Sequence, residues 1–200
     1  MPSPPRLVLA SASPARLKTL QNAGLSPEVI VSGVDESTVE KTGPADYTLR
    51  LAQLKAVAVA ANEKRAIVIG CDSVLALDGE ILGKPGTEDE AIERWQQMRG
   101  RSGVLHTGHC VIDTHREVWL ARTAATQVRF AHVTDEEIEA YVATGEPLEV
   151  AGAFTLDGLG GAFVSGVTGD PHNVVGISLP LLRLMFEELG FAWTEFWMGS

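Results

Sequence analysis

Short apolar runs alternate along the chain with longer segments whose apolar residues recur at helical spacing. The short runs indicate buried strands, because they are rich in Val, Ile and Leu and are bounded by turn-forming or charged residues. The longer segments indicate helices, several of which are delimited by capping residues and glycines. In the first part of the chain this pattern predicts strands at 7–10, 28–31, 66–70 and 73–77, and helices at 15–23 and 47–63.

Turn and cap residues mark the elements that follow. Asp78-Gly79 is a strong hairpin signal, Thr87 is placed as a helix cap, and Thr134 with Glu137 forms a capping-box pattern. Helices between strands favour a parallel component, whereas hairpins favour an antiparallel one. We therefore expect an α/β fold with a mixed twisted sheet and flanking helices, in one domain spanning 1–200. The remaining pattern predicts strands at 80–82, 104–114 and 117–130, and helices at 87–98, from 134 and at 179–189.

Composition and charge narrow the function classes. The 200 residues carry a net charge of −10, which argues against non-specific binding of DNA or RNA. This charge still permits a local basic pocket for a small phosphorylated ligand. Cys71 and Cys110 form no disulfide framework or zinc motif, and His106 and His109 would point to opposite faces of a strand. No signal peptide or membrane span is visible, so we expect a cytoplasmic protein with no membrane partner.

The first strand-to-helix junction has the features of an anion site. Ser11 and Ser13 follow the strand at 7–10, and Pro14 is suited to the first helical position. The free N–H groups of a helix start attract phosphate, and Arg16 lies one turn into the helix, where it could reach the same anion. For this segment taken alone, a capped helix with a solvated Arg16 is the simpler explanation.

Two lysines and several acids are further candidates. Lys84 lies in Gly-Lys-Pro, which fails as a phosphate-binding P-loop because proline replaces the Ser or Thr that binds magnesium. Lys55 lies among alanines in a helix, and taken singly each lysine is more simply a surface residue. Asp72 follows the predicted strand at 66–70, and strand ends are where open sheets present their chemistry. Aspartate is unfavourable in β-type sequence, so a metal or a water to activate would explain it, and so would a turn or a local hydrogen bond to Ser73. Glu36 follows Asp35 in an acidic pair that could bind magnesium or could be a solvated loop.

Taken together, these segments resemble the Maf family of nucleotide pyrophosphatases. The resemblance runs in order from about residue 6 to residue 189, close to the expected core at 6–190. The matching pieces are the Ser-Ala-Ser-Pro-x-Arg run, Val-Asp-Glu at 34–36, Leu-Ala-x-x-Lys-Ala at 51–56, Asp-Ser-Val at 72–74, Ile-Leu-Gly-Lys-Pro at 81–85, Ala-Gly-x-Phe at 151–154, Gly-Asp at 169–170 and Asn-Val-Val-Gly at 173–176.

The resemblance implies two lobes around a central cleft, as in inosine-triphosphate pyrophosphatases, and hydrolysis of nucleoside triphosphates to monophosphate and pyrophosphate. It also implies a divalent cation, Mg²⁺ or Mn²⁺, held by Glu36 and Asp72, and a homodimer. The expected catalytic residues are Asp72 as the base, Glu36 and Lys84, although Asp72 could instead chiefly hold the metal while Glu36 acts as base. The residues expected to contact the substrate are Ser11, Ser13, Arg16, Lys55 and Asp157, with Lys84 also on the triphosphate.

Two positions depart from the family pattern. Ala15 stands where the family often has a first arginine, which removes one expected phosphate contact. Asp157 stands where pyrimidine-preferring members have Gln and members acting on methylated guanine nucleotides have Glu, so base preference does not transfer. The tail residues Trp193, Phe196 and Trp197 either pack on the domain or form a dimer contact.

Two other functions remain open from the sequence. A nucleotide-binding regulator of cell division without turnover would use the same anion site, and a general phosphate-ester hydrolase would release orthophosphate. Acids near phosphates favour catalysis over binding alone, so we expect an enzyme that removes non-standard or surplus nucleotides. That expectation requires Arg16 and Lys84 to converge on Asp72.

Overall fold

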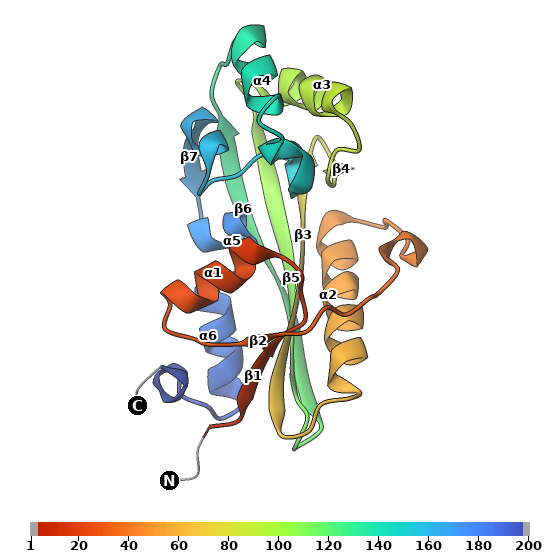
Figure 1. Cartoon of the computed structure of the whole chain (residues 1–200), viewed down its shortest axis with the longest axis vertical. Helices are drawn as coiled ribbons and strands as arrows, with labels where there is room; N and C mark the ends of the chain where they lie inside the picture. Colours follow the sequence, from red (N-terminus) through yellow and green to blue (C-terminus); the bar gives the residue numbers. More distant parts are fainter. Residues whose placement is uncertain (1–3, 198–200) are drawn as a thin grey trace.

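A seven-stranded mixed sheet forms the centre of the computed structural model, which describes residues 4–197 (Figure 1). Its strands follow the order β2-β1-β3-β5-β6-β7, and β4 pairs with β3. This architecture confirms the α/β class predicted from the sequence. The strands are β1 (Arg6–Leu9), β2 (Glu28–Val29), β3 (Ala66–Leu77), β4 (Glu80–Leu82), β5 (Ser102–Asp113), β6 (Val118–Phe130) and β7 (Val164–Thr168).

Helices cover both faces of the sheet. Figure 1 shows α2 on one side of the long strands, α1 and α6 on the other, and α3 and α4 at the far end. The α-helices are α1 (Pro14–Asn22), α2 (Pro44–Ala60), α3 (Glu88–Met98), α4 (Asp135–Val142), α5 (Pro171–Val175) and α6 (Leu179–Glu188). Short 3₁₀ turns are η1 (Glu36–Thr38), η2 (Glu146–Glu149), η3 (Ala151–Ala153), η4 (Leu159–Phe163) and η5 (Trp193–Phe196).

The cap and turn signals form as the sequence predicts. The hydroxyl of Ser13 accepts from the backbone N–H of Arg16 at the start of α1, and Thr87 caps α3 in the same way. Thr134 and Glu137 complete a reciprocal capping box at α4. These starts were predictable because each cap satisfies backbone donors within one turn of chain.

The third strand corrects one expectation. Residues 66–70 and 73–77 belong to a single strand, β3, so Asp72 lies inside a strand instead of following its end. Pairing with β5 is continuous from Ile67 to Ala76, which satisfies the backbone groups around Asp72 that point toward β5. β1 pairs in parallel with β2 and β3, and the other strand pairs are antiparallel, as expected for a mixed sheet.

Most of the buried apolar side chains lie in two regions along the long strands, one under α3 and α4 and one toward the termini. Under α3 and α4, Trp95 is fully buried and its ring meets Phe130, Tyr141 and Phe163 edge to face. Toward the termini, the helices α1, α2 and α6 bury aliphatic side chains against β1, β3 and β5. The site described below lies on β3 between these regions.

The C-terminal tail packs on the second of these core regions. Phe196 is buried and its ring lies 5.1 Å from Phe186, while Trp193 lies 5.5 Å from the same ring. Residues 198–200 lie outside the described part of the chain.

Both cysteines are buried and free. Between residues 4 and 197, no helix has the length and apolar character to cross a bilayer, and the expected cytoplasmic location stays a prediction.

Candidate active site

A gap in strand pairing exposes one edge of β3. On this edge, β1 pairs with β3 as far as Ile69, and β4 begins to pair only at Leu75. Within the described structure, residues 70–74 therefore have no strand partner on this side, although β5 pairs with them on the other. Asp72 and Ser73 lie in the gap. Successive side chains of a strand point to opposite faces of the sheet. At the gap, Asp72 therefore points to one face and Ser73 to the other.

The helix α2 lies directly on the sheet at this gap because two glycines allow it. Gly70 and Gly108 lie on the α2 face of β3 and β5. A Cβ atom at Gly70 would lie 2.3 Å from the carbonyl oxygen of Ala52, and one at Gly108 would lie 2.2 Å from that of Thr48. Only residues without a side chain permit this approach. The approach carries Lys55, on the inward face of α2, to Asp72.

Lys55 links two carboxylates. Its ammonium lies 2.5 Å from Oδ1 of Asp72 and 2.6 Å from Oε1 of Glu36, which η1 presents from the loop before α2. Asp72 is only 8% exposed and Lys55 only 9%, whereas Glu36 is exposed. Burial raises the pKa of Asp72, and the nearby charges of Lys55 and Arg16 oppose that rise. Lys55 therefore places an ammonium directly against a buried carboxylate.

Arg16 occupies the other face of the sheet. Its Nε donates to the carbonyl of Gly176 at 2.8 Å, and its terminal nitrogens donate to the hydroxyls of Ser11 at 3.1 Å and Ser73 at 3.0 Å. Gly176 has a φ of +120°, and a Cβ atom there would lie 3.2 Å from Nε of Arg16. The half-buried guanidinium is therefore fixed by contacts from the loop before α1, from β3 and from the turn after α5.

Sequence reasoning did not assign a site role to three residues that hold this arrangement. Ser73 also shares a hydrogen bond of 2.9 Å with the hydroxyl of Thr107, which in turn donates to the carbonyl of Asn173. Gly176 supplies the acceptor for Arg16. Ser73 was detectable as the neighbour of Asp72, but the contribution of Thr107 depends on strand register, which the sequence does not show.

Three other predicted site residues, Ser13, Lys84 and Asp157, form no hydrogen bond or ion pair with Asp72 or Lys55 in the described structure. Ser13 serves as the cap of α1. Lys84 is 65% exposed in its side chain and lies 3.9 Å from Glu149. Asp157 is exposed in the loop between η3 and η4. That loop is held by Glu146, whose carboxylate accepts hydrogen bonds from the hydroxyls of Tyr141 and Thr155 and from the backbone N–H groups of Leu159 and Gly160.

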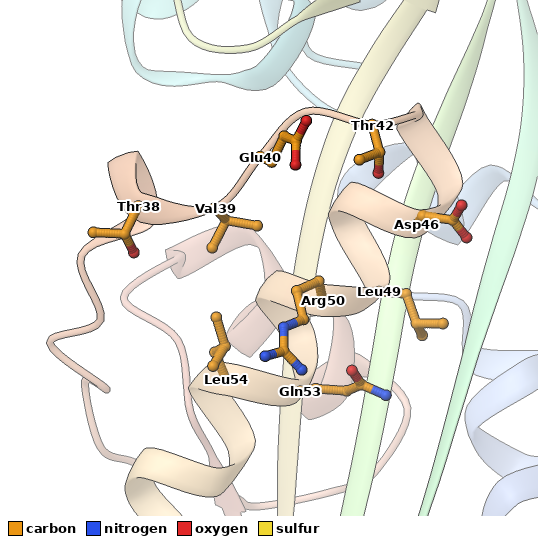
Figure 2. Close-up of a pocket in the computed structure, with 9 residues that line it drawn as sticks. All are labelled: Thr38, Val39, Glu40, Thr42, Asp46, Leu49, Arg50, Gln53 and Leu54. Atoms are coloured by element: carbon orange, nitrogen blue, oxygen red, sulfur yellow. The ribbon is translucent and has the colours of Figure 1, made fainter.

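A surface groove of about 590 Å³ lies on the outward face of α2 (Figure 2). The segment 38–42 borders it on one side, and Arg50 projects into it from the helix. Lys55 belongs to the opposite, inward face, so the groove is separate from the gap in β3. The residues that line it are Thr38, Val39, Glu40, Thr42, Asp46, Leu49, Arg50, Gln53 and Leu54.

Comparison with known proteins identifies the family. The model of the Maf-like protein family matches residues 6–189. The chain belongs to the Maf family. A relative from Salinispora tropica, named nucleoside triphosphate pyrophosphatase, is 58% identical over 97% of this chain and 88% of its own length. A Streptomyces avermitilis protein of the same name is also 58% identical, over 96% of this chain and 94% of its own.

More distant relatives carry the same name. A protein from Trichormus variabilis, also named nucleoside triphosphate pyrophosphatase, is 52% identical over 96% of this chain and 98% of its own length. Among solved structures, a HAM1 protein from Coxiella burnetii aligns with a TM-score of 0.43 and 19% identity, over 64% of this chain and 74% of that one.

Proposed function

We propose that this Maf-family chain hydrolyses nucleoside triphosphates to the nucleoside monophosphate and pyrophosphate. One observation carries the proposal: a buried carboxylate, Asp72, lies in a gap of the sheet where Lys55 approaches from one face and Arg16 from the other. The name shared by relatives at 58% identity supports the same reaction. The substrate class and the roles of individual residues are part of the proposal.

The geometry supplies what triphosphate hydrolysis needs. A triphosphate carries about four negative charges, which repel a nucleophile unless they are screened. Arg16 and Lys55 provide fixed positive charge, and Ser11 provides a hydroxyl beside the guanidinium. Asp72 takes the proton from the attacking water. Lys55 favours the charged form of Asp72, so the base is ready to accept a proton despite its burial.

A divalent cation fits the same acids. The carboxylates of Asp72 and Glu36 converge on the ammonium of Lys55, so a divalent cation held between them would take the position of that ammonium. In the part of the chain that the structure describes, no three His, Cys, Asp or Glu side chains form a metal-binding group. Asp72 and Glu36 would hold Mg²⁺ or Mn²⁺, with water and phosphate oxygens as the other ligands. When bound, the cation screens phosphate charge and lowers the pKa of water.

The test is a product assay on purified protein with Mg²⁺ and a panel of ordinary and modified nucleoside triphosphates. We expect pyrophosphate and monophosphate, and we expect Asp72→Asn to lower turnover by roughly 100-fold to 10,000-fold. Asp89→Asn is the matched control, because Asp89 is exposed in the first turn of α3. Tight triphosphate binding without turnover would favour a regulator, and release of orthophosphate would favour a phosphate-ester hydrolase.

Four finer assignments complete the proposal. Asp157 contributes to base selection, Lys84 reaches the triphosphate, and the enzyme removes non-standard or surplus nucleotides as a homodimer. The family resemblance supports these assignments. Light scattering on the purified protein checks the dimer, and the nucleotide panel repeated with Asp157→Gln and Lys84→Gln checks the two side chains.

A further inference from the structure

His109 is a buried histidine that the reaction described above does not use. It lies on β5 with no exposed surface, on the face covered by α5 and α6. Its Nε2 accepts a hydrogen bond of 2.8 Å from the backbone N–H of Ser178, and its Nδ1 lies 3.0 Å from the carbonyl oxygen of Thr107. An amide N–H only donates and a carbonyl only accepts. Both contacts are therefore satisfied by the neutral ring with its proton on Nδ1.

The contact with Ser178 fixes the turn that holds Arg16. Ser178 is the cap residue of α6, and Gly176, two residues earlier, accepts from Nε of Arg16 at 2.8 Å. The turn 176–178 thus lies between two anchors, the imidazole at one end and the guanidinium at the other. Thr107 strengthens the link, because its carbonyl faces His109 while its hydroxyl contacts Ser73, a second partner of Arg16.

We propose that His109 is a positioning residue that fixes the 176–178 turn and so orients the Arg16 guanidinium for the triphosphate. This inference rests on the proposed role of Arg16 in substrate binding. Burial, and then the nearby charge of Arg16, lower the pKa of His109 to about 4, so the ring stays neutral and keeps its acceptor nitrogen near neutral pH. An apolar side chain of similar size would fill the space but leave the Ser178 N–H without a partner.

The experiment compares His109→Leu with His109→Gln. The amide of Gln offers both an acceptor for the Ser178 N–H and a donor for the Thr107 carbonyl, whereas Leu offers neither. We expect His109→Leu to raise KM for the triphosphate about tenfold, the effect of losing one hydrogen-bonded orientation, with kcat within about twofold. His109→Gln should restore most of the affinity. Phe186→Leu, in the same core region, is the control that lowers Tm without raising KM.

A double-mutant cycle separates a role through Arg16 from general destabilisation. In an Arg16→Ala background, which should itself raise KM, His109→Leu should raise KM no further. The same added factor in both backgrounds, or no rescue by His109→Gln, would overturn this inference alone. An unchanged KM for Arg16→Ala would overturn the role of Arg16 and this inference with it. If His109→Leu does not fold, His109→Met removes the same acceptor and takes its place in the cycle.

Discussion

We expect the free energy of unfolding to fall as the pH is lowered, because of the buried His109. The pKa of His109 is about 4 in the folded chain, against an ordinary value of 6.5, because the ring is buried and Arg16 lies near it; Asp170 opposes the shift. Above pH 6.5 the ring is neutral in both states and contributes nothing. Between these two pKa values the unfolded chain binds a proton that the folded chain does not, so the free energy of unfolding falls as the pH falls.

The size of the loss follows from the two pKa values. At pH 5 the ordinary imidazole is almost fully protonated while the buried one is mostly neutral, which lowers the free energy of unfolding by about 2 kcal/mol relative to pH 7. Below pH 4 both states bind the proton and the loss stops growing. The assay is urea denaturation of the wild-type protein and His109→Gln at pH 7 and pH 5. Other titrating groups, including Asp72 and His106, are present in both proteins and cancel in the difference. An equal fall in both proteins would refute the reasoning.

Three further predictions concern the site and its supports. Lys55→Gln removes a charge that lowers the pKa of Asp72, so the acid limb of the kcat/KM profile should move to higher pH, which a pH–rate series would show. Glu146→Ala removes an acceptor of four hydrogen bonds and should destabilise the fold by about 2 kcal/mol, measured by urea denaturation, with faster proteolysis of the loop that it holds. Gly70→Ala would press a methyl group on the Ala52 carbonyl; we expect a loss of about 1–3 kcal/mol by thermal unfolding and lower turnover, while normal values for both would show that the contact yields easily.

The sequence predicted local features well and long-range ones less well. Helix starts at Ser13, Thr87 and Thr134 depend on bonds within one turn, so their signals are complete in a few residues. Lys55 looked like a surface lysine because its neighbours are alanines. Its burial depends on the close approach of α2 to the sheet. The sequence feature that could have predicted this approach is the glycine in an apolar strand, Gly70, which leaves room for the helix backbone.

Asp72 was expected at the end of a strand, but it lies inside β3. An acid at a strand end needs no partner, since water reaches it, whereas an acid inside a strand must be compensated where it lies. Here β5 pairs with the backbone on one edge, and Lys55 compensates the carboxylate. The proposed hydrolysis therefore depends on the gap in strand pairing on the opposite edge of β3. No single segment of sequence encodes this gap, because it is the space left between β1 and β4.

The same gap accounts for the place of Lys84 in the proposed reaction. Asp72 and Ser73 face opposite sides of the sheet, so in the proposed reaction a triphosphate in the gap would meet Lys55 on one side and Arg16 on the other. Lys84 follows β4, the strand that closes the far end of the gap. Its pairing with Glu149, at 3.9 Å between exposed side chains, is of a kind that contributes little free energy. Phosphate oxygens would therefore compete with Glu149 for Lys84 at small cost.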